Sequence, residues 1–538
     1  MCVKTHVFLL LRLTVSFFML SFSIILHFNN IPVDGGTMKK LRLVFLLLAV
    51  CVASVFVACD KFAEIPIVEN QFWGFDFGAE KARSVFADRI AENAYVVIYL
   101  ERGQGHRVSR ADAQIMADEF AGPIRNTILR YFSPNSISIN LNGTKAEFRD
   151  ILHFANHVAG GGAEGRTTIL LYDIRSGDMG GAFVAGFFLA MDMMQRGPIP
   201  NSPFHANGRD MLHINTLLFT QQDGLKEANL TVIHELAHLV NFTQSLNMWF
   251  ANGAGSQTPL RLFDTWVDEA LAMQAEHMYL GRALEGRIAW FVNDWYGTIS
   301  RGNNFFVWGN HSGAAILDDY STAYLFLRWL FLHAEATPGF DIYNFFYRMV
   351  TSPYENYRVV TNVARDIRPE WENWEILLGT WHAANFFPQH PDFGYRGDLG
   401  ISLKEGVRAI YGQSSISLYP GEGVFSSIVG SFTPPEYGGH IRYVGLTPTG
   451  GISIGASSAI NGSTLLTFNA NTIISNRAET GFLTNVAQIP APLSAVPLPE
   501  LGPYAVGAWS LFRGNRGIEV PSGFTLPFKK NHDVSEGQ

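Results

Sequence analysis

The stretch LTVIHELAHLVNFT, residues 230–243, has the spacing of a half-buried helix. Its apolar residues form an arc away from the histidines: Ile233, Leu236, Ala237 and Val240. His234 and His238 are four residues apart and differ by about 40° of rotation on a helix, so both imidazoles can point at one metal ion. The sequence therefore predicts a helix with a metal-binding face.

Glu235 completes the pattern H-E-x-x-H, in which the glutamate sits beside the two imidazoles and can polarise a water molecule on the metal. Zinc suits this set of ligands, and we expect one Zn²⁺ per chain. The alternative is a buried amphipathic helix whose histidines only satisfy hydrogen bonds. That alternative leaves Glu235 unexplained.

A catalytic zinc site needs a third protein ligand and one open position. The metzincin pattern would place Gly and His at the third and sixth positions after His238, where this chain has Asn241 and Gln244. A downstream helix that begins near Trp266 offers an acid instead, and Glu269 is the predicted third ligand. Asp268 or another acid remains an alternative.

On that downstream helix Glu276 lies about 20° from Glu269 and so shares its face, whereas Asp268 lies about 100° away. Glu276 could therefore orient a ligand histidine or border a substrate cleft. An exposed polar face is an equally good interpretation of Glu276 and His277.

The rest of the chain indicates a mixed α/β fold. Apolar runs at 94–100, 136–141, 167–174 and 211–215 predict strands, the last possibly at an edge, and Ser109 opens a helix toward Tyr131. The sequence after residue 251 has a largely helical pattern. The sequence after residue 415 is rich in turn residues and predicts short strands at 441–444, 451–454 and 463–468. We predict four parts: a leader at 1–58, a sheet-containing zincin-like subdomain at 59–250, a helical lobe at 251–414 and a β-rich domain at 415–538.

The N-terminus predicts export. From Met38 a basic start and an apolar run lead to Ala58-Cys59, which resembles a bacterial lipoprotein signal peptide at 38–58. Acyl chains on Cys59 would then anchor the mature chain to a membrane, at the periplasmic face or the cell surface. Residues 1–37 are predicted to be an extension from a wrongly assigned start. One transmembrane anchor at 7–28 is the alternative.

Composition excludes several classes of protein. Only 16% of the 538 residues are charged and 47% are hydrophobic, which excludes a disordered chain. The formal charge of -8, without a basic cluster, argues against a nucleic-acid partner. The 3 cysteines all lie in the first 59 residues, so no disulfide is expected in the folded body.

The helix around His234 and His238 and the Trp266-x-x-Glu269 helix resemble the hyicolysin-type zinc metallopeptidases of the thermolysin-like gluzincin group. The resemblance extends over roughly residues 95–385. It implies zinc, peptide hydrolysis, Glu235 as general base and Glu269 as third ligand. A tyrosine often assists the oxyanion in similar gluzincins, and Tyr320, with Tyr324 as the alternative, begins a suitable helix.

The leading hypothesis is an exported, lipid-anchored zinc endopeptidase that acts on protein or peptide substrates. A gluzincin aminopeptidase is the alternative within the enzymes, but the Gly-x-Met-Glu-Asn segment that those enzymes use to bind a free amine is absent. The alternative outside the enzymes is a surface-binding lipoprotein, an adhesin or scaffold without turnover. Fold alone does not decide between these functions.

Overall fold

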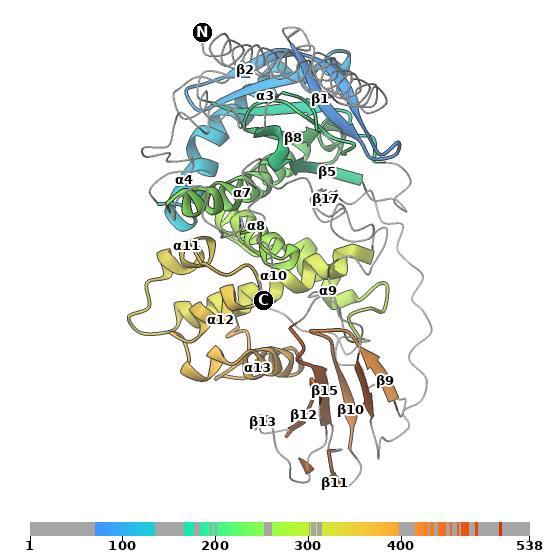
Figure 1. Cartoon of the computed structure of the whole chain (residues 1–538), viewed down its shortest axis with the longest axis vertical. Helices are drawn as coiled ribbons and strands as arrows, with labels where there is room; N and C mark the ends of the chain where they lie inside the picture. The colour runs from blue at the N-terminus through green and yellow to red at the C-terminus, as the bar shows by residue number, and fades with distance from the viewer. Residues whose placement is uncertain are drawn as a thin grey trace, which may run out of the picture. The chain divides into compact units, whose positions relative to one another are not determined.

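The computed structural model has a mixed α/β fold, as predicted (Figure 1). It describes residues 70–134, 166–176, 183–193, 196–199, 202–251, 261–300, 302, 308 and 315–397, followed by shorter stretches between 415 and 507. All of these lie in one unit, Glu69–Gln538. The leader, Cys59 and the strand expected at 136–141 fall outside the described residues. Across the described helices, none combines the length and the apolar character that a membrane span requires.

A mixed sheet forms the N-terminal part. Within the described residues its strand order is β1-β2-β3-β4-β8-β5-β17. The strands are β1 (Gln71–Asp76), β2 (Lys81–Glu92), β3 (Val96–Glu101), β4 (Thr167–Tyr172), β5 (Phe183–Phe188), β8 (Met211–Asn215) and β17 (Ala505–Gly507). Strands β3, β4 and β8 run parallel, and β5 is antiparallel to β8. The neighbouring β1 and β2 form an antiparallel hairpin, and β17 runs parallel to β5.

Two expectations for the sheet are wrong. The sequence predicts no strand before residue 94, whereas β1 and β2 precede it, and β2 has a mixed burial pattern because one of its faces is exposed. The strand at 211–215 is not an edge, because β8 pairs with β4 on one side and with β5 on the other. All five residues of β8 are buried, as expected of a strand with neighbours on both sides.

The helix expected after Ser109 begins where the sequence predicts. The Ser109 side chain accepts from the backbone N–H of Asp112, and the Asp112 carboxylate accepts from the backbone N–H of Ser109, so a capping box opens α3 (Arg110–Glu119). A π-helical turn at Phe120–Ile124, which contains Pro123, joins it to α4 (Arg125–Tyr131).

The helix predicted at 230–243 is longer than expected. α7 spans Gly224–Ala251 and packs against β5 and β8 of the sheet (Figure 1). Gly224 opens it at a close approach, because a Cβ there would lie 2.4 Å from the carbonyl oxygen of Leu218. The apolar arc of the sequence pattern is fully buried: Ile233, Leu236, Ala237 and Val240 each have 0% exposure.

A helical region follows α7, as expected. Its helices are α8 (Thr265–Leu280), α9 (Glu285–Asn293), α10 (Ile316–Glu335), α11 (Phe345–Val350), α12 (Arg358–Ala364) and α13 (Trp374–Phe386). α8 packs against both α7 and α10, so it lies between the helix of the H-E-x-x-H pattern and α10.

The strands after residue 415 confirm a small β-rich region. An antiparallel sheet has the order β10-β15-β12-β13, formed by β10 (Gly423–Ser427), β12 (Ile441–Leu446), β13 (Ile452–Ile454) and β15 (Thr464–Asn469). Short pairs flank it: β9 (Ser415–Leu418) with β16 (Glu479–Phe482), and β11 (Ser431–Phe432) with β14 (Ile460–Asn461).

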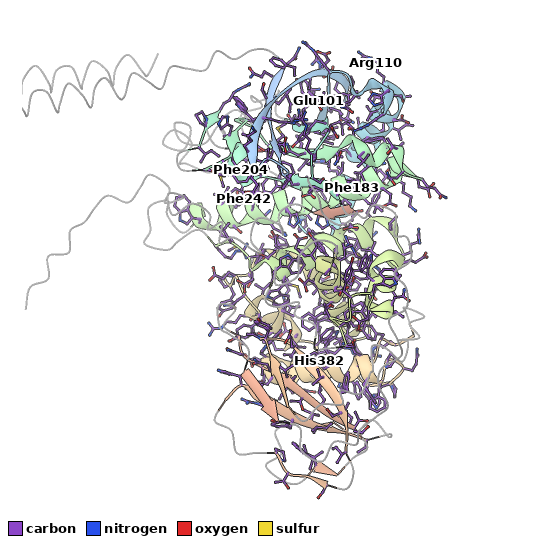
Figure 2. The ribbon with its side chains drawn as sticks, turned by 90° about the vertical axis from the view of Figure 1, so that its right-hand side faces the viewer. Glu101, Arg110, Phe183, Phe204, Phe242 and His382 are labelled. Atoms are coloured by element: carbon purple, nitrogen blue, oxygen red, sulfur yellow. The ribbon has the colours of Figure 1, made fainter. Side chains whose placement is uncertain are left out.

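Contacts from α13 hold this region in place. His382, labelled in Figure 2, makes a 3.1 Å hydrogen bond from Nε2 to the carbonyl oxygen of Gly421. A Cβ on Gly423 would lie 2.9 Å from the same ring, so a glycine lets the strand approach the histidine. Arg442 of β12 contacts Glu375 of α13 through two hydrogen bonds of 2.6 and 2.7 Å.

Candidate metal site

The two histidines of α7 lie inside the protein. His234, Glu235 and His238 have only 4, 1 and 2% exposure, because α7 is covered by the sheet on one side and by α8 on the other. Three titratable side chains buried on one helical turn are uncommon unless they have partners. The partners come from α8.

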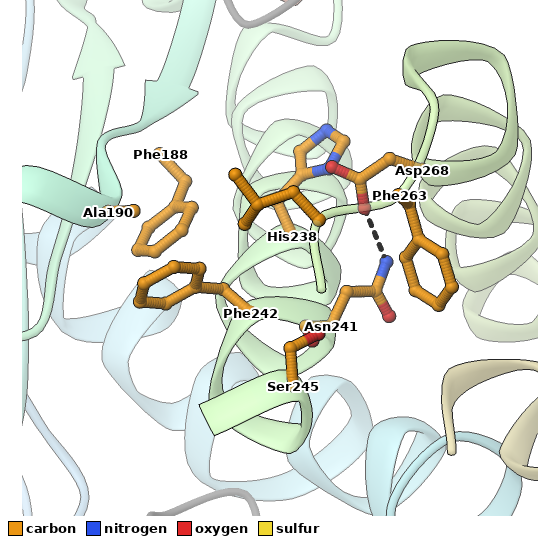
Figure 3. Close-up of a pocket in the computed structure, with 9 residues that line it drawn as sticks. Phe188, Ala190, His238, Asn241, Phe242, Ser245, Phe263 and Asp268 are labelled. Atoms are coloured by element: carbon orange, nitrogen blue, oxygen red, sulfur yellow. Dashed lines mark hydrogen bonds and ion pairs between the residues drawn. The ribbon is translucent and has the colours of Figure 1, made fainter. Parts of the chain in front are cut away.

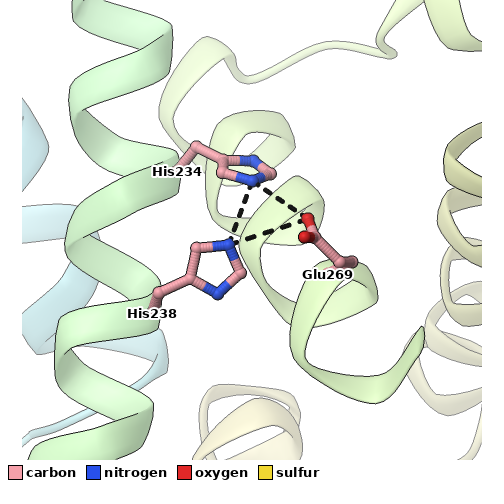
Figure 4. Close-up of side chains that lie close together, drawn as sticks. All are labelled: His234, His238 and Glu269. Atoms are coloured by element: carbon pink, nitrogen blue, oxygen red, sulfur yellow. Dashed lines mark hydrogen bonds and ion pairs between the residues drawn. The ribbon is translucent and has the colours of Figure 1, made fainter. Parts of the chain in front are cut away.

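α8 places Glu269 opposite the two imidazoles (Figure 4). Its Oε2 lies 3.2 Å from Nε2 of His234 and 3.6 Å from Nε2 of His238, and the two Nε2 atoms are 3.1 Å apart. The side chain of Glu269 is fully buried. These three residues form a group whose ligand atoms all lie within 4.8 Å of one another.

A carboxylate also lies against Nδ1, the second ring nitrogen, of each of the two histidines. Glu276 Oε1 lies 2.7 Å from Nδ1 of His234, and Asp268 Oδ2 lies 3.1 Å from Nδ1 of His238. A carboxylate accepts the Nδ1–H of a neutral imidazole, and from this network we assign the Nε2 lone pairs to the side of Glu269. This carboxylate–histidine arrangement is the one that orients histidine ligands in metal proteins.

The donor set fits a divalent cation. Two Nε2 lone pairs and one carboxylate converge, and such groups repel one another unless a proton or a metal ion lies between them. Two imidazoles with one carboxylate are also a ligand set of catalytic zinc sites, which keep a fourth position for water. His234, His238 and Glu269 are therefore the residues that could hold the metal.

The pKa values show how strongly this pocket favours positive charge. Burial alone would lower the pKa of His234, but hydrogen bonds to Glu269 and Glu276 outweigh it and raise the pKa to about 9. Burial opposes ionisation of Glu269, yet the charges and hydrogen bonds of His238 and His234 lower its pKa to about 2. Burial likewise opposes charging of His238, but Asp268 and Glu269 raise its pKa well above the usual value.

Glu235 lies next to this group without belonging to it. Neither of its carboxylate oxygens meets hydrogen-bond geometry with a residue that the structure describes. Burial raises the pKa of Glu235 to about 7, while the two histidines and the backbone amide of Phe188 favour its charged form. A carboxylate in this setting can accept and return a proton near neutral pH.

The structure distinguishes the two tyrosines of α10. The hydroxyl of Tyr320 donates to Oε1 of Glu269 over 3.3 Å, so it lies against the predicted third ligand. Tyr324 instead lies 2.9 Å from Nδ1 of His277 and accepts from the backbone of Leu284. Tyr320 therefore contacts one of the three grouped residues, whereas the bonds given for Tyr324 lead to His277 and Leu284.

The polar residues of α8 do not form the exposed face that was one interpretation of the sequence. Glu276 and His277 are buried, at 9 and 6% exposure, rather than on an exposed face. Asp268, the alternative third ligand, lies on the outer nitrogen of His238 instead. Asn241 donates to Asp268 over 2.7 Å and so completes the support of that histidine. Asn241 lies three residues after His238 and so on the same face of the helix (Figure 3), and this spacing is the sequence signal that could have placed Asn241 near that histidine.

Comparison with known proteins gives one relevant similarity. The sequence matches no family model. It is similar to a protein described as "Neutral metalloprotease ShpI" from Staphylococcus hyicus, with 31% identity over 172 residues. The match covers 31% of this chain and 35% of that protein, so the chain spans about a third of the length of the relative. This distant and partial similarity agrees with a metallopeptidase and with a bound metal.

Proposed function

We propose that this protein is a zinc-dependent peptidase that hydrolyses internal bonds of proteins or peptides. The observation that carries the proposal is the convergence of His234, His238 and Glu269, with Glu235 beside them. The similarity to a neutral metalloprotease supports the same reaction class.

In this mechanism the chain provides the ligands and the proton carrier. A bound zinc ion would polarise the substrate carbonyl and lower the pKa of the attacking water. Glu235 takes the proton from that water and delivers it to the leaving amine. Asp268 and Glu276 keep both imidazoles oriented, and the burial of the site excludes bulk water.

A Glu235→Gln substitution tests the mechanism. The amide keeps the shape of the side chain but cannot accept the proton, so peptide cleavage should fall by about 10²–10⁴-fold while zinc stays bound. Zinc content is measured on the purified protein, and cleavage is measured on casein and peptides with and without a chelator. Glu119→Gln is the matched control, because Glu119 is a partly buried acceptor for Tyr279.

Two outcomes would contradict the proposal in different ways. Casein hydrolysis retained by Glu235→Gln with zinc bound would refute the role of Glu235. Zinc bound by the unmodified protein without cleavage of any tested polymer would favour the surface-binding alternative. A peptide with a blocked N-terminus separates the two peptidase classes, because an endopeptidase cleaves it and an aminopeptidase does not.

We also propose that Tyr320 donates its hydroxyl to the developing oxyanion. Its contact with Glu269 supports this role over Tyr324. Tyr320→Phe should lower kcat by about 10²–10³-fold, as expected for the loss of one oxyanion donor. Tyr324→Phe, which removes the same hydroxyl from the same helix, is the control. Equal losses in both variants would exclude a specific role for Tyr320.

We further propose that the chain is exported and anchored through Cys59. The basic segment, the apolar run and the Ala58-Cys59 boundary of the sequence support this proposal. Mass spectrometry should find a mature chain that begins at an acylated Cys59. Cys59→Ala should move the protein out of the membrane fraction, and an intact N-terminus at residue 1 would contradict both statements.

A further inference from the structure

Two arginines lie together where a short hairpin meets the first strand of the sheet. The hairpin consists of β6 (Gly197–Pro198) and β7 (His205–Ala206), which pair with each other. Arg196 directly precedes β6, and Arg209 follows β7 after three residues. The pairing of the two strands therefore brings both arginines to the open end of the hairpin.

Both guanidinium groups reach the beginning of β1. Nη2 of Arg196 donates to the carbonyl oxygen of Gln71 over 2.6 Å, and the guanidinium carbon of Arg209 lies 5.2 Å from the centre of the Phe72 ring. Gln71 and Phe72 are consecutive, so the two cations lie near each other. Burial lowers the pKa of Arg196, and the charge of Arg209 lowers it further, because two like charges repel each other.

The charges of this arginine pair are not neutralised. Among the described residues, neither arginine forms an ion pair with a carboxylate, and Nε of each is buried without a hydrogen-bond partner. Burial lowers the pKa of Arg209, although Tyr99 and Asp192 favour its charged form. The oxygens of Asp192 are already engaged by Asn207 and His213. An arginine does not lose its proton in a protein, so the cost of the two charges persists.

Other half-buried arginines of the sheet have the partner that this pair lacks. Arg83 lies 2.6 Å from Glu101, and Arg166 lies 2.7 Å from Glu92. Buried charges are generally paired, and a cation left without a partner is costly. The contrast indicates that an anion from outside the chain neutralises Arg196 and Arg209.

A phosphate group matches this pair best. Each guanidinium offers a planar fork of N–H donors, which suits the oxygens of a carboxylate or a phosphate. A carboxylate carries one negative charge and would neutralise only one arginine. A phosphate group carries up to two negative charges and has enough oxygens to accept from both forks.

We propose that Arg196 and Arg209 form a binding site for a phosphate group, apart from the candidate metal site. Phe72, over which Arg209 lies, belongs to a different core cluster from the metal-site helices. The phosphate comes from a membrane-lipid headgroup or from a free phosphate compound, which present the same chemistry. The site goes beyond the proposed peptidase function and does not depend on it.

The chain length favours the lipid source. Residues 60–70, which link Cys59 to the beginning of β1, span at most about 40 Å when fully extended. If Cys59 carries acyl chains, Arg196 and Arg209 therefore stay within reach of the membrane surface. Only this choice of source rests on the proposed anchor.

The first test measures the binding of inorganic phosphate to the purified protein by calorimetry, with sodium chloride at equal ionic strength as the reference. Arg196→Gln and Arg209→Gln should each weaken phosphate binding by at least about tenfold, because charged hydrogen bonds are lost. The titration is repeated with a chelator, since phosphate also binds zinc, and the arginine-dependent part should be the same. Absence of binding, or equal binding by the variants, would overturn the inference.

Control variants separate a phosphate site from a structural role. Arg166→Gln should leave the phosphate affinity unchanged, because Arg166 is a half-buried arginine that is already paired. Arg209→Lys keeps the charge without the fork and should keep part of the affinity. Phosphate should raise the melting temperature of the unmodified protein but not that of Arg209→Gln. An equal loss of melting temperature in buffers with and without phosphate would show a purely structural role and contradict the inference.

Vesicles distinguish the two sources. Sedimentation compares vesicles that contain phosphatidylglycerol with vesicles of phosphatidylcholine alone. A preference for the anionic vesicles that is lost in Arg209→Gln, but not in Arg166→Gln, assigns the site to a lipid headgroup. Binding of inorganic phosphate without this preference assigns it to a free phosphate compound. Casein hydrolysis should be unchanged in Arg196→Gln and Arg209→Gln, and its absence in the unmodified protein would contradict the peptidase proposal alone.

Discussion

Two buried histidine clusters lie at the same sheet, and they differ in whether their lone pairs converge on one point. His234 and His238 each have a carboxylate on Nδ1, and their Nε2 atoms converge with Glu269. His213 of β8 contacts Asp192 through Nε2 over 2.6 Å and stacks on Phe187 in the other core cluster.

In the second cluster, which we call the closed cluster, both oxygens of the Asp192 carboxylate are engaged, although Nδ1 of His213 has no hydrogen-bond partner among the described residues. Oδ1 of Asp192 accepts from the backbone and the side-chain amide of Asn207, at 3.1 and 2.6 Å, and Oδ2 lies against Nε2 of His213. Burial and a carboxylate partner are common to both clusters. Only the first has several lone pairs that converge on one point, and this convergence is what indicates a metal site.

The largest effect that would separate the two clusters is loss of metal binding. Glu269→Gln removes the anionic ligand with little change in volume, so stoichiometric zinc should be lost. The unmodified protein should gain about 4 kcal/mol of stability when zinc is present at about 1,000 times its dissociation constant, and the variant should not. Melting temperatures with and without zinc measure this gain.

The control for this experiment is Asp192→Asn, which makes the same kind of change in the closed cluster. It should keep the response to zinc. Unchanged zinc content in Glu269→Gln would refute the comparison.

A third buried histidine, His382, is expected to make the stability of the protein depend on pH. Burial lowers the pKa of His382, whose hydrogen bond goes to a backbone carbonyl and not to a carboxylate, to about 4. The unfolded chain, with a histidine pKa near 6.5, binds the proton first as pH falls. The stabilising contribution is therefore complete above about pH 6.5 and is lost as pH falls toward 4, by about 3 kcal/mol at most.

His382→Gln tests this contribution, because it keeps a donor for the Gly421 carbonyl but cannot titrate. Denaturant unfolding at pH 7, 5.5 and 4 should show a smaller loss of stability on acidification in the variant than in the unmodified protein. Parallel pH dependence in the two proteins would contradict the prediction.

Smaller effects are expected from the residues that orient the ligands. Glu276→Gln and Asp268→Asn should each weaken zinc binding by about 10–100-fold, because the imidazoles lose their charged acceptors but keep their metal-facing nitrogens. Competition with a fluorescent chelator measures the affinity. An affinity equal to that of the unmodified protein would show that the two carboxylates do not act on the ligands.

The smallest effect is expected in the closed cluster. Asp192→Asn replaces one acceptor by a donor that faces His213 or Asn207, which should cost about 1–2 kcal/mol of unfolding free energy. Zinc affinity should not change. A drop in zinc affinity as large as that of Asp268→Asn would mean that the two clusters are coupled.

The sequence by itself determined the helix and the pair of imidazoles. Rotation of about 100° per residue places His234 and His238 on one face and the apolar arc on the other, whatever the helix packs against. The fold class and the β-rich strands after 415 also follow from local pattern. The hairpin before residue 94 could not be predicted, because the partly exposed β2 lacks a regular apolar alternation.

Only the tertiary structure decided which acids meet which histidines. Asp268, Glu269 and Glu276 lie on one helix, and their spacing fixes their directions relative to one another but not toward α7. The packing of α8 against α7 aims Glu269 at both Nε2 atoms and leaves Asp268 and Glu276 for the outer nitrogens. The contact of Tyr320 with Glu269 has the same origin, since distances between elements depend on packing across the core.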